Sequence, residues 1–236
     1  MERKIVFAPG EFYHIYNRGV DKRVIFTNDA DRRRFIRLMY LSNGDIAFKY
    51  RDVEKLPFEE IKTGEKSVAI GAYCLMGNHF HILIKEIKDG GISSFMGKLQ
   101  TGYSMYFNRM HKRTGTLFEG TFKAKHVEDD DEYLKYLYAY IHLNPVKLSS
   151  AGWESEVKHI ENPKAASEFL EKYPWSSYLD YCGLNREENL ILSKAEFPGY
   201  FDEKGSFDDM HHDWISYEET PEEDQTHRGL PYANFA

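Results

Sequence analysis

Hydrophobic and polar residues alternate in one short stretch of the first 90 residues, and two further stretches are rich in β-forming residues, which together predict three β-strands there. These stretches are residues 11–19 (EFYHIYNRG), 67–75 (SVAIGAYCL) and 79–86 (HFHILIKE). Met76-Gly77-Asn78 is a short turn-forming link, so we expect the second and third stretches to pair as a hairpin. Residues 116–127 (TLFEGTFKAKHV) alternate more loosely and indicate another strand or extended segment.

Apolar residues at intervals of three and four predict helices between and after these strands. The first helix is expected to begin at a cap at Asn28 or Asp29. Three more are expected over residues 90–113, from Asp131 to Asn144, and over about 163–172. Pro145 is expected to end the third helix and leave its last turn exposed. The order of elements predicts an α+β fold, an antiparallel sheet with helices packed on it, of the ferredoxin-like or RRM-like kind.

The chain length allows one main domain with an extension. We assign residues 1–150 to the main domain, with a polar insertion near residues 43–66. Residues 151–236 are expected to form a mainly helical or irregular C-terminal extension that ends in an acidic tail.

The composition is that of a globular protein rich in aromatic residues, with 17 Tyr and 16 Phe. No apolar run approaches the ~20 residues that span a bilayer, and the first residues lack the apolar stretch of a secretory signal. We therefore expect no membrane partner and a cytoplasmic location. Cys74 and Cys182 have no paired spacing, which argues against a disulfide framework and a cysteine zinc site.

The net charge of −7 is unevenly distributed along the chain. Residues 201–236 contain ten acidic and two basic residues, a net charge of −8, which leaves residues 1–200 at +1. Basic residues gather beside aromatic ones between Lys98 and Lys125, where Glu119 is the one acidic residue. Such a stretch is typical of contact with a phosphate backbone, and equally of a solvated helix face.

His79 and His81 lie two residues apart in a predicted strand, so both imidazoles project from the same face of the sheet. Two neutral imidazoles form half of a site for a divalent metal. The alternative is a pair of partly exposed structural histidines.

Tyr133, Tyr136, Leu137, Tyr140 and Asn144 share one stripe of the predicted helix 131–144. Most aromatic stripes are core. Asn144, however, is a poor core residue and lies one turn from Tyr140, so its carboxamide and the phenol project together. A phenol with a pKa of ~10 is a weak nucleophile towards a phosphodiester, and a nearby divalent cation would assist it.

The ordered segments YHIYNRG (13–19), YCLMGNHFHILIKE (73–86), YFNRMHKRTGTLFEGTFKAKHVEDDDEYL (106–134), YIHLNPVK (140–147) and YPWSSY (173–178) resemble the REP-associated single-tyrosine transposases. These enzymes belong to the wider group of nucleases with a His-hydrophobe-His motif. The resemblance implies that the main domain is catalytic, that His79 and His81 bind Mg²⁺ or Mn²⁺, and that Tyr140 is the nucleophile. Asn144, four residues after the tyrosine, is implied as a third metal ligand.

The resemblance also implies the reaction and the partner. Tyr140 would attack a phosphate of single-stranded or hairpin DNA, form a 5′-phosphotyrosine, and release a 3′-hydroxyl that can later rejoin strands. The candidates for contact with DNA are Arg18, Lys22, Arg23, Lys98, Arg109, Lys112, Arg113, Lys123 and Lys125, with Tyr106 and Phe107 as possible stacking platforms. Core packing is the alternative for the two aromatic residues.

Two other functions stay open on the residues alone. One is a domesticated protein that binds hairpin DNA without cleaving it. The other is metal-dependent hydrolysis by an activated water, for which the chain offers no carboxylate cluster. The residues leave open whether the protein is a monomer or a homodimer.

Overall fold

An antiparallel sheet forms the centre of the computed structural model, which describes residues 5–127, 130–149, 153–154, 159–201 and 206–215. Within these residues the sheet has four strands in the order β2-β3-β1-β4. The strands are β1 (Phe12–Arg18), β2 (Val68–Leu75), β3 (His79–Glu86) and β4 (Lys123–Val127). Helix α1 (Asp29–Ser42) joins β1 to β2, and α3 (Gly91–Met110) joins β3 to β4. This βαββαβ chain order with that strand order is ferredoxin-like, so the predicted fold class is confirmed.

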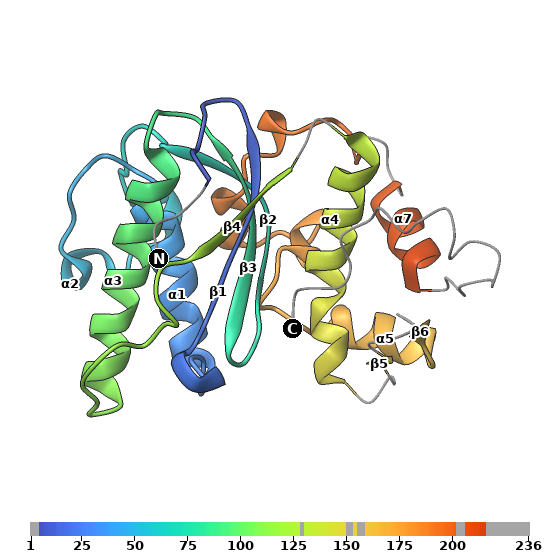
Figure 1. Ribbon diagram of the computed structural model, residues 1–236, viewed down its shortest axis with the longest axis horizontal. Helices are drawn as coiled ribbons and strands as arrows, with labels where there is room; N and C mark the ends of the chain where they lie inside the picture. The colour runs from blue at the N-terminus through green and yellow to red at the C-terminus, as the bar shows by residue number, and fades with distance from the viewer. Residues whose placement is uncertain (1–4, 128–129, 150–152, 155–158, 202–205, 216–236) are drawn as a thin grey trace.

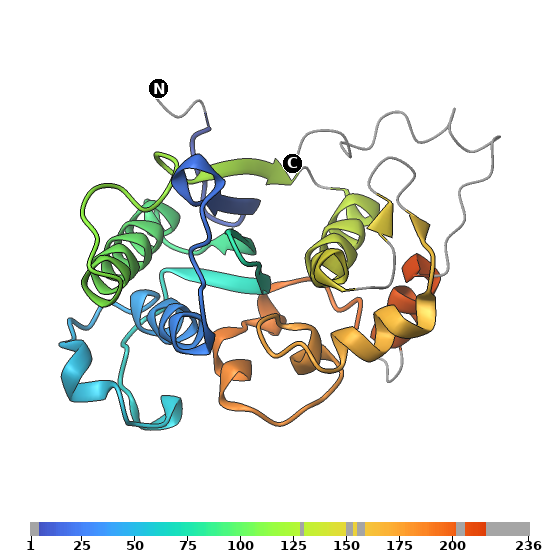
Figure 2. The same cartoon turned by 90° about the horizontal axis from the view of Figure 1, so that it is seen from below.

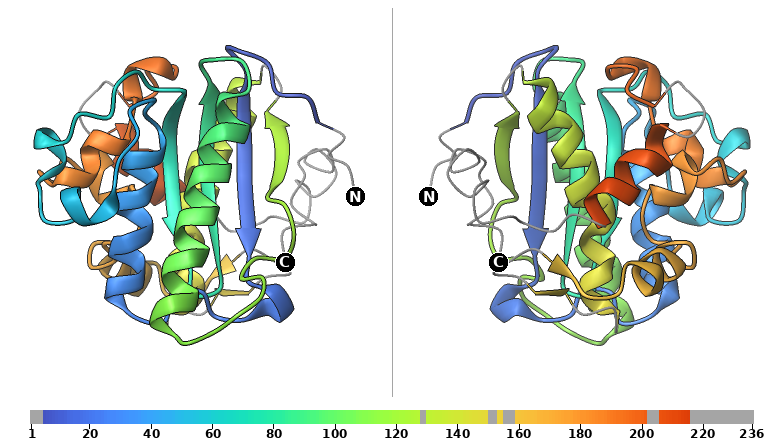
Figure 3. Two further views of the ribbon diagram at one scale, coloured as in Figure 1. Left: turned by 90° about the vertical axis from the view of Figure 1, so that its left-hand side faces the viewer. Right: turned by 90° about the vertical axis from the view of Figure 1, so that its right-hand side faces the viewer.

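Helices cover both faces of the sheet. Figure 3 shows α1 and α3 side by side over one face and α4 (Asp131–Leu143) over the other, and Figure 2 shows the same layers from below. Alternation along β3 explains the two layers, because Phe80, Ile82 and Ile84 pack in the core with α1 and α3, whereas Leu83 packs with α4. The polar strand positions that share the face of Leu83 therefore lie beneath α4.

The predicted helices begin close to where the sequence places them. The side chain of Asn28 accepts a hydrogen bond from the amide of Asp31 and caps α1. The carboxylate of Asp130 accepts hydrogen bonds from the amides of Glu132 and Tyr133 and caps α4. These local caps account for the accuracy of the predicted starts.

Two local predictions were correct only in part. Of residues 116–127, only Lys123–Val127 form a strand, because the chain turns through Gly120 with a φ of 72° before it joins the sheet. Pro145 does not leave an exposed end either. The chain continues from α4 into a 3₁₀ helix, η3 (Asn144–Leu148), in which proline fits the first turn, and Asn144, Pro145 and Val146 are buried.

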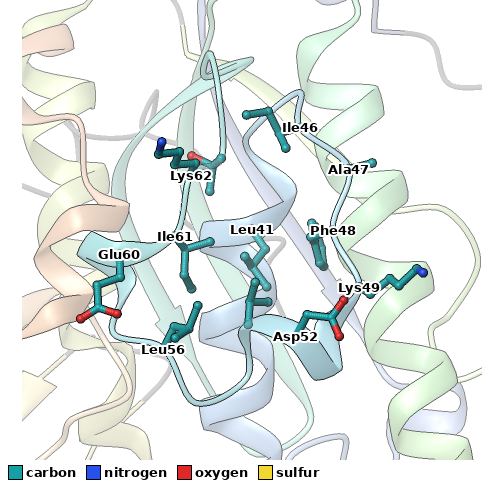
Figure 4. A pocket seen from close by; sticks show the side chains of 12 residues that line it. Leu41, Ile46, Ala47, Phe48, Lys49, Asp52, Leu56, Glu60, Ile61 and Lys62 are labelled. Atoms are coloured by element: carbon teal, nitrogen blue, oxygen red, sulfur yellow. The ribbon is translucent and has the colours of Figure 1, made fainter.

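The insertion near residues 43–66 folds over the end of α1. It contains the short helix α2 (Tyr50–Val53) and the 3₁₀ helix η2 (Phe58–Glu60). Outside the insertion, a further 3₁₀ turn, η1 (Val20–Lys22), follows β1. A hollow of about 350 Å³ lies between the insertion and α1, with Leu41 and Ile61 among its apolar walls and Lys49 and Asp52 among its charged ones; Figure 4 shows these side chains. It lies on the opposite side of the molecule from α4 (Figure 1).

The chain after residue 152 packs against α4 and the outer edge of β2. Its elements are β5 (Trp153–Glu154), β6 (His159–Ile160), α5 (Pro163–Leu170), α6 (Tyr178–Tyr181), η4 (Glu187–Ile191), η5 (Lys194–Glu196) and α7 (Ser206–Ile215). Three backbone hydrogen bonds of 2.9–3.0 Å join the β2 edge to this segment: Leu75 N to Trp175 O, Ser177 N to Tyr73 O, and Ser193 N to Ile70 O. The extension is thereby tied to the sheet, and α5 confirms the helix expected near residue 163.

Some sequence predictions fall outside the described residues. These are the boundary near residue 150 and most of the acidic tail, at residues 202–205 and 216–236. Within the described part of the chain, no helix is long and apolar enough to cross a membrane.

Candidate active site

The two predicted histidines meet the predicted tyrosine between the sheet and α4. His79 and His81, on β3, have ring centroids 5.0 Å apart. The ring of Tyr140, near the C-terminal end of α4, lies 5.5 Å from that of His81 in an edge-on contact. The structure therefore brings these three residues together, as the family resemblance implies.

Each histidine makes a hydrogen bond through Nδ1. His79 Nδ1 lies 2.6 Å from the side-chain oxygen of Asn78. His81 Nδ1 lies 3.0 Å from Nε2 of His14, a residue of β1. Nε2 of His81 is buried and has no hydrogen-bond partner among the described residues. Hydrogen bonding of one ring nitrogen is the arrangement of metal-binding histidines, whose other nitrogen holds the ion.

Both imidazoles are neutral at pH 7. Burial lowers the pKa of His79 to about 4, with further contributions from the charges of Lys147 and Arg18. Burial also lowers the pKa of His81 well below its ordinary value, and the neighbouring His14, His79 and Lys147 add to the shift. The neutral form is the one that binds metal ions.

Tyr140 and Asn144 are neighbours at the end of α4. Burial raises the pKa of the Tyr140 phenol to about 12, and hydrogen bonding by the Asn144 side chain opposes this shift. Nδ2 of Asn144 donates to the backbone carbonyl of Tyr140 at 2.7 Å. Oδ1 of Asn144 is buried and has no hydrogen-bond partner within the described residues. Tyr140 is therefore a protonated phenol at pH 7, beside an amide oxygen available as a ligand.

The donor set of His79, His81 and Asn144 fits a divalent cation. Two buried polar atoms that the described protein leaves unsatisfied, His81 Nε2 and Asn144 Oδ1, are ligand atoms of the expected kinds. Imidazole nitrogens suit Mn²⁺ better than Mg²⁺, which prefers oxygen. The described residues contain no group of three His, Cys, Asp or Glu side chains placed to hold a metal, so Asn144 would complete this set.

Two residues at the site were missed by the sequence prediction. His14 contacts both His81 and Tyr140, with ring centroids 5.1 Å and 5.9 Å away. Nζ of Lys147 lies 5.5 Å from the centroid of the Tyr140 ring. Lys147 follows Tyr140 by seven residues, about two helical turns, and this spacing was a signal that could have identified it.

Some of the candidate DNA-binding cations surround this site. Arg18 pairs with His79 in the register of β1 and β3 and forms an ion pair with Glu119. The backbone carbonyl of Lys22 accepts a hydrogen bond from Asn78 at 3.2 Å, which places Lys22 beside the turn that precedes His79. On β4, Lys123 and Lys125 share the face of the sheet that carries the site, and Nζ of Lys125 lies 4.8 Å from the centroid of the Tyr133 ring.

Other candidate cations lie away from the histidines or are held by protein groups. Nζ of Lys98 donates to the carbonyl of Gly44 at 2.9 Å, on the layer of α1 and α3. Arg23 donates to the carbonyl of Val20 and Arg113 to the side chain of Asn108. Arg109 and Lys112, at the end of α3, are exposed.

The prediction of aromatic stacking platforms is corrected for Phe107. Its side chain is 3% exposed and belongs to the core between α3 and the sheet, so it cannot stack on a base. Tyr106 is half-buried, and its hydroxyl donates to Asp31 at 3.1 Å. Core packing, the alternative reading of the sequence, holds for Phe107.

Comparisons with known proteins agree with the motifs. Residues 50–144 match the family model described as "Transposase IS200 like". This match agrees with the resemblance to single-tyrosine transposases indicated by the sequence segments. A solved structure titled as the REP-associated tyrosine transposase bound to a REP hairpin is 14% identical and covers 80% of this chain and 90% of its own, with a TM-score of 0.49. Among curated proteins, none is significantly similar to the chain.

Proposed function

We propose that this protein, similar over residues 50–144 to the IS200-like transposases, nicks and rejoins single-stranded, hairpin-containing DNA through Tyr140. The observation that carries the proposal is the meeting of one phenol with two neutral imidazoles. Tyr140 lies edge-on to His81, and His79 and His81 are hydrogen-bonded through Nδ1. This arrangement supports a metal-assisted attack by a tyrosine on a phosphodiester.

Each residue of the candidate site has its own role in this proposal. His79, His81 and Asn144 would hold Mg²⁺ or Mn²⁺, and the bound cation would neutralise charge on the phosphate oxygens. The oxygen of Tyr140 forms a bond to phosphorus and loses its proton, while the bond from phosphorus to the 3′-oxygen breaks and that oxygen takes up a proton. The products are a 5′-phosphotyrosine and a free 3′-hydroxyl, and the reverse displacement rejoins strands.

The basic residues around the site support a nucleic-acid substrate. Arg18, Lys22, Lys123 and Lys125 come from β1, η1 and β4 and lie at or beside the face that carries the histidines. Cations in this position would hold the phosphates on either side of the reacting one. A hairpin substrate rests on the family resemblance.

A covalent adduct tests the proposal directly. Incubation of the protein with labelled single-stranded hairpins and Mn²⁺ is expected to give a band of protein-bound DNA on a denaturing gel. Tyr140→Phe removes only the nucleophilic oxygen, so hairpin binding should persist while the adduct falls below detection. Tyr136→Phe is the matched control, because Tyr136 lies one turn earlier with its ring 6.0 Å from that of Tyr140.

The outcomes distinguish three functions. An adduct that persists in Tyr140→Phe and disappears in Tyr136→Phe would identify Tyr136 as the nucleophile and leave the proposed reaction unchanged. Hairpin binding without any adduct in the unmodified protein would favour the DNA-binding function without cleavage. Cleavage without an adduct would indicate hydrolysis by water.

A further inference from the structure

We infer that His14 is a positioning residue of the metal site, holding His81 in the tautomer whose Nε2 can bind a cation. The inference rests on the proposed function only in taking His81 as a metal ligand. His14 lies on β1, opposite Leu83 and diagonal to His81 in the antiparallel register. The two imidazoles are nearly coplanar, with centroids 5.1 Å apart and planes at 22°, and the side chain of His14 is completely buried.

The hydrogen bond between the two rings permits two arrangements of protons. Nε2 of His14 and Nδ1 of His81 are 3.0 Å apart, so one of them donates and the other accepts. If His14 donates, neutral His81 carries its proton on Nε2 and has no lone pair there for a metal. If His81 donates, its Nε2 is a free acceptor.

Only the second arrangement agrees with a metal on His81. In that case Nδ1–H of His81 donates to Nε2 of His14, and His14 carries its own proton on Nδ1. The buried Nε2 of His81 then carries a lone pair that a cation can take up. His79 is fixed in the same tautomer, because the side-chain oxygen of Asn78 can only accept.

His14 also fixes the direction of the His81 ring. The hydrogen bond holds the His81 ring at Nδ1 and leaves Nε2 uncovered by His14, while the rings of His14 and Tyr140 lie 5.9 Å apart in an edge-on contact. One imidazole therefore touches both the proposed ligand and the proposed nucleophile. An outer partner of this kind contributes roughly 10- to 100-fold to metal affinity in proteins.

The tautomer can be measured without any metal. In the metal-free protein labelled with ¹⁵N-histidine, long-range ¹H–¹⁵N spectra are expected to show His81 protonated on Nδ1. His14→Leu, which has no acceptor, should mix the tautomers of His81. His14→Gln, which offers a carboxamide oxygen, should keep the Nδ1–H form.

Metal affinity provides the second readout. Mn²⁺ binding, followed by electron paramagnetic resonance or calorimetry, should weaken by roughly 10- to 100-fold in His14→Leu and stay close to that of the unmodified protein in His14→Gln. Tyr16→Phe is the matched control, because Tyr16 shares the strand and face and its ring lies 5.9 Å from that of His81. It should change neither readout.

Two results would overturn the inference. One is an Nε2–H tautomer of His81 in the unmodified metal-free protein. The other is a folded His14→Leu protein that binds Mn²⁺ as tightly as the unmodified one. If the unmodified protein fails to bind Mn²⁺, the proposed metal function is overturned, while the tautomer spectra still decide whether His14 positions His81.

Discussion

Burial makes the oxygen of Tyr140, the proposed nucleophile, harder rather than easier to deprotonate. Burial raises the pKa of Tyr140 to about 12, so the phenolate is rare at neutral pH. A positive charge near the ring lowers the cost of forming the anion and of bringing a phosphate beside it. Lys147, with Nζ 5.5 Å from the ring centroid, is the side chain placed to provide that charge.

Lys147→Gln is therefore expected to slow formation of the covalent adduct. Loss of one cation beside the reacting phosphate should reduce the rate by roughly 10- to 100-fold, or about 1.4–2.7 kcal/mol in the barrier. The measurement is a single-turnover time course of adduct formation at saturating DNA. Lys147→Arg should retain most of the rate.

Lys135→Gln is the control for that experiment. Lys135 is on the same helix and forms an ion pair with Glu132 at 3.0 Å. Its replacement should leave the rate unchanged. A Lys147→Gln protein that reacts at the unmodified rate would contradict the role assigned to Lys147.

At the scale of elements, the candidate DNA-binding cations divide between two parts of the molecule. The charges of Lys22 (η1) and Lys123 (β4) both help to lower the pKa of Glu119. Both lysines lie near the histidines. Lys98 is on α3, in the layer on the other face of the sheet, with its ammonium on the carbonyl of Gly44. Under the proposed function, DNA bound at Tyr140 would therefore contact the first group and not Lys98.

The salt dependence of DNA binding should follow this division. Each phosphate contact contributes about 0.7–0.9 to the slope of log affinity against log salt. Lys22→Ala combined with Lys123→Ala should flatten the slope by roughly 1.4–1.8, whereas Lys98→Ala should leave it unchanged. Fluorescence anisotropy of a labelled hairpin at several salt concentrations measures both. Equal slopes in the two variants would contradict the division.

The helices and strands also show which parts of the fold and of the candidate site could be predicted from the sequence. The alternation of β3 and the apolar stripes of α1, α3 and α4 are local patterns, so the strands and helices could be predicted from them, whereas the meeting of His81 with Tyr140 was expected only from the family resemblance. Contacts across strands were not predictable in this way. His14 reaches His81 only through the register of β1 with β3, which no local pattern reveals.

The errors in the sequence predictions have two different causes, one local and one in the packing of a helix on the sheet. Residues 116–127 alternate like a strand, but Gly120 permits a turn that a residue with a side chain would resist. Tyr106 and Phe107 are adjacent on a helix, so they point in different directions. Only the packing of α3 on the sheet decides that Phe107 is the buried one.

At the scale of the whole molecule, α4 is packed between the sheet and the C-terminal extension. His211 of α7 is buried beside His142 of α4, with ring centroids 5.4 Å apart, and its Nδ1 lies 3.0 Å from the carbonyl of Phe207. Burial lowers the pKa of His211 from 6.5 to about 4. The contact between α7 and α4 therefore requires a neutral histidine.

Acid should weaken the fold through this residue. Between about pH 6.5 and 4, His211 binds a proton in the unfolded chain but not in the folded chain, so the free energy of unfolding falls as the pH falls across that range. The loss from His211 is on the order of 3 kcal/mol at most. His211→Phe should lose less stability than the unmodified protein between pH 7 and about pH 4, measured by chemical denaturation.

His212 supplies the comparison, since it is adjacent and exposed. His212→Gln should lose as much stability on acidification as the unmodified protein. If His211→Phe shows that same loss, the acid sensitivity arises elsewhere.

The hydrogen bonds along the outer edge of β2 have a consequence for how copies of the protein can associate. An open strand edge is a template for pairing with another chain, but the amides of Leu75, Ser177 and Ser193 already join β2 to the extension. Within the described residues, the other outer strand of the sheet is β4. Two copies that paired there would bring Lys123 and Lys125 against their equivalents, and like charges in opposition are unfavourable. Within the described part of the chain, edge-to-edge pairing of the sheet between two copies is therefore disfavoured at both outer strands.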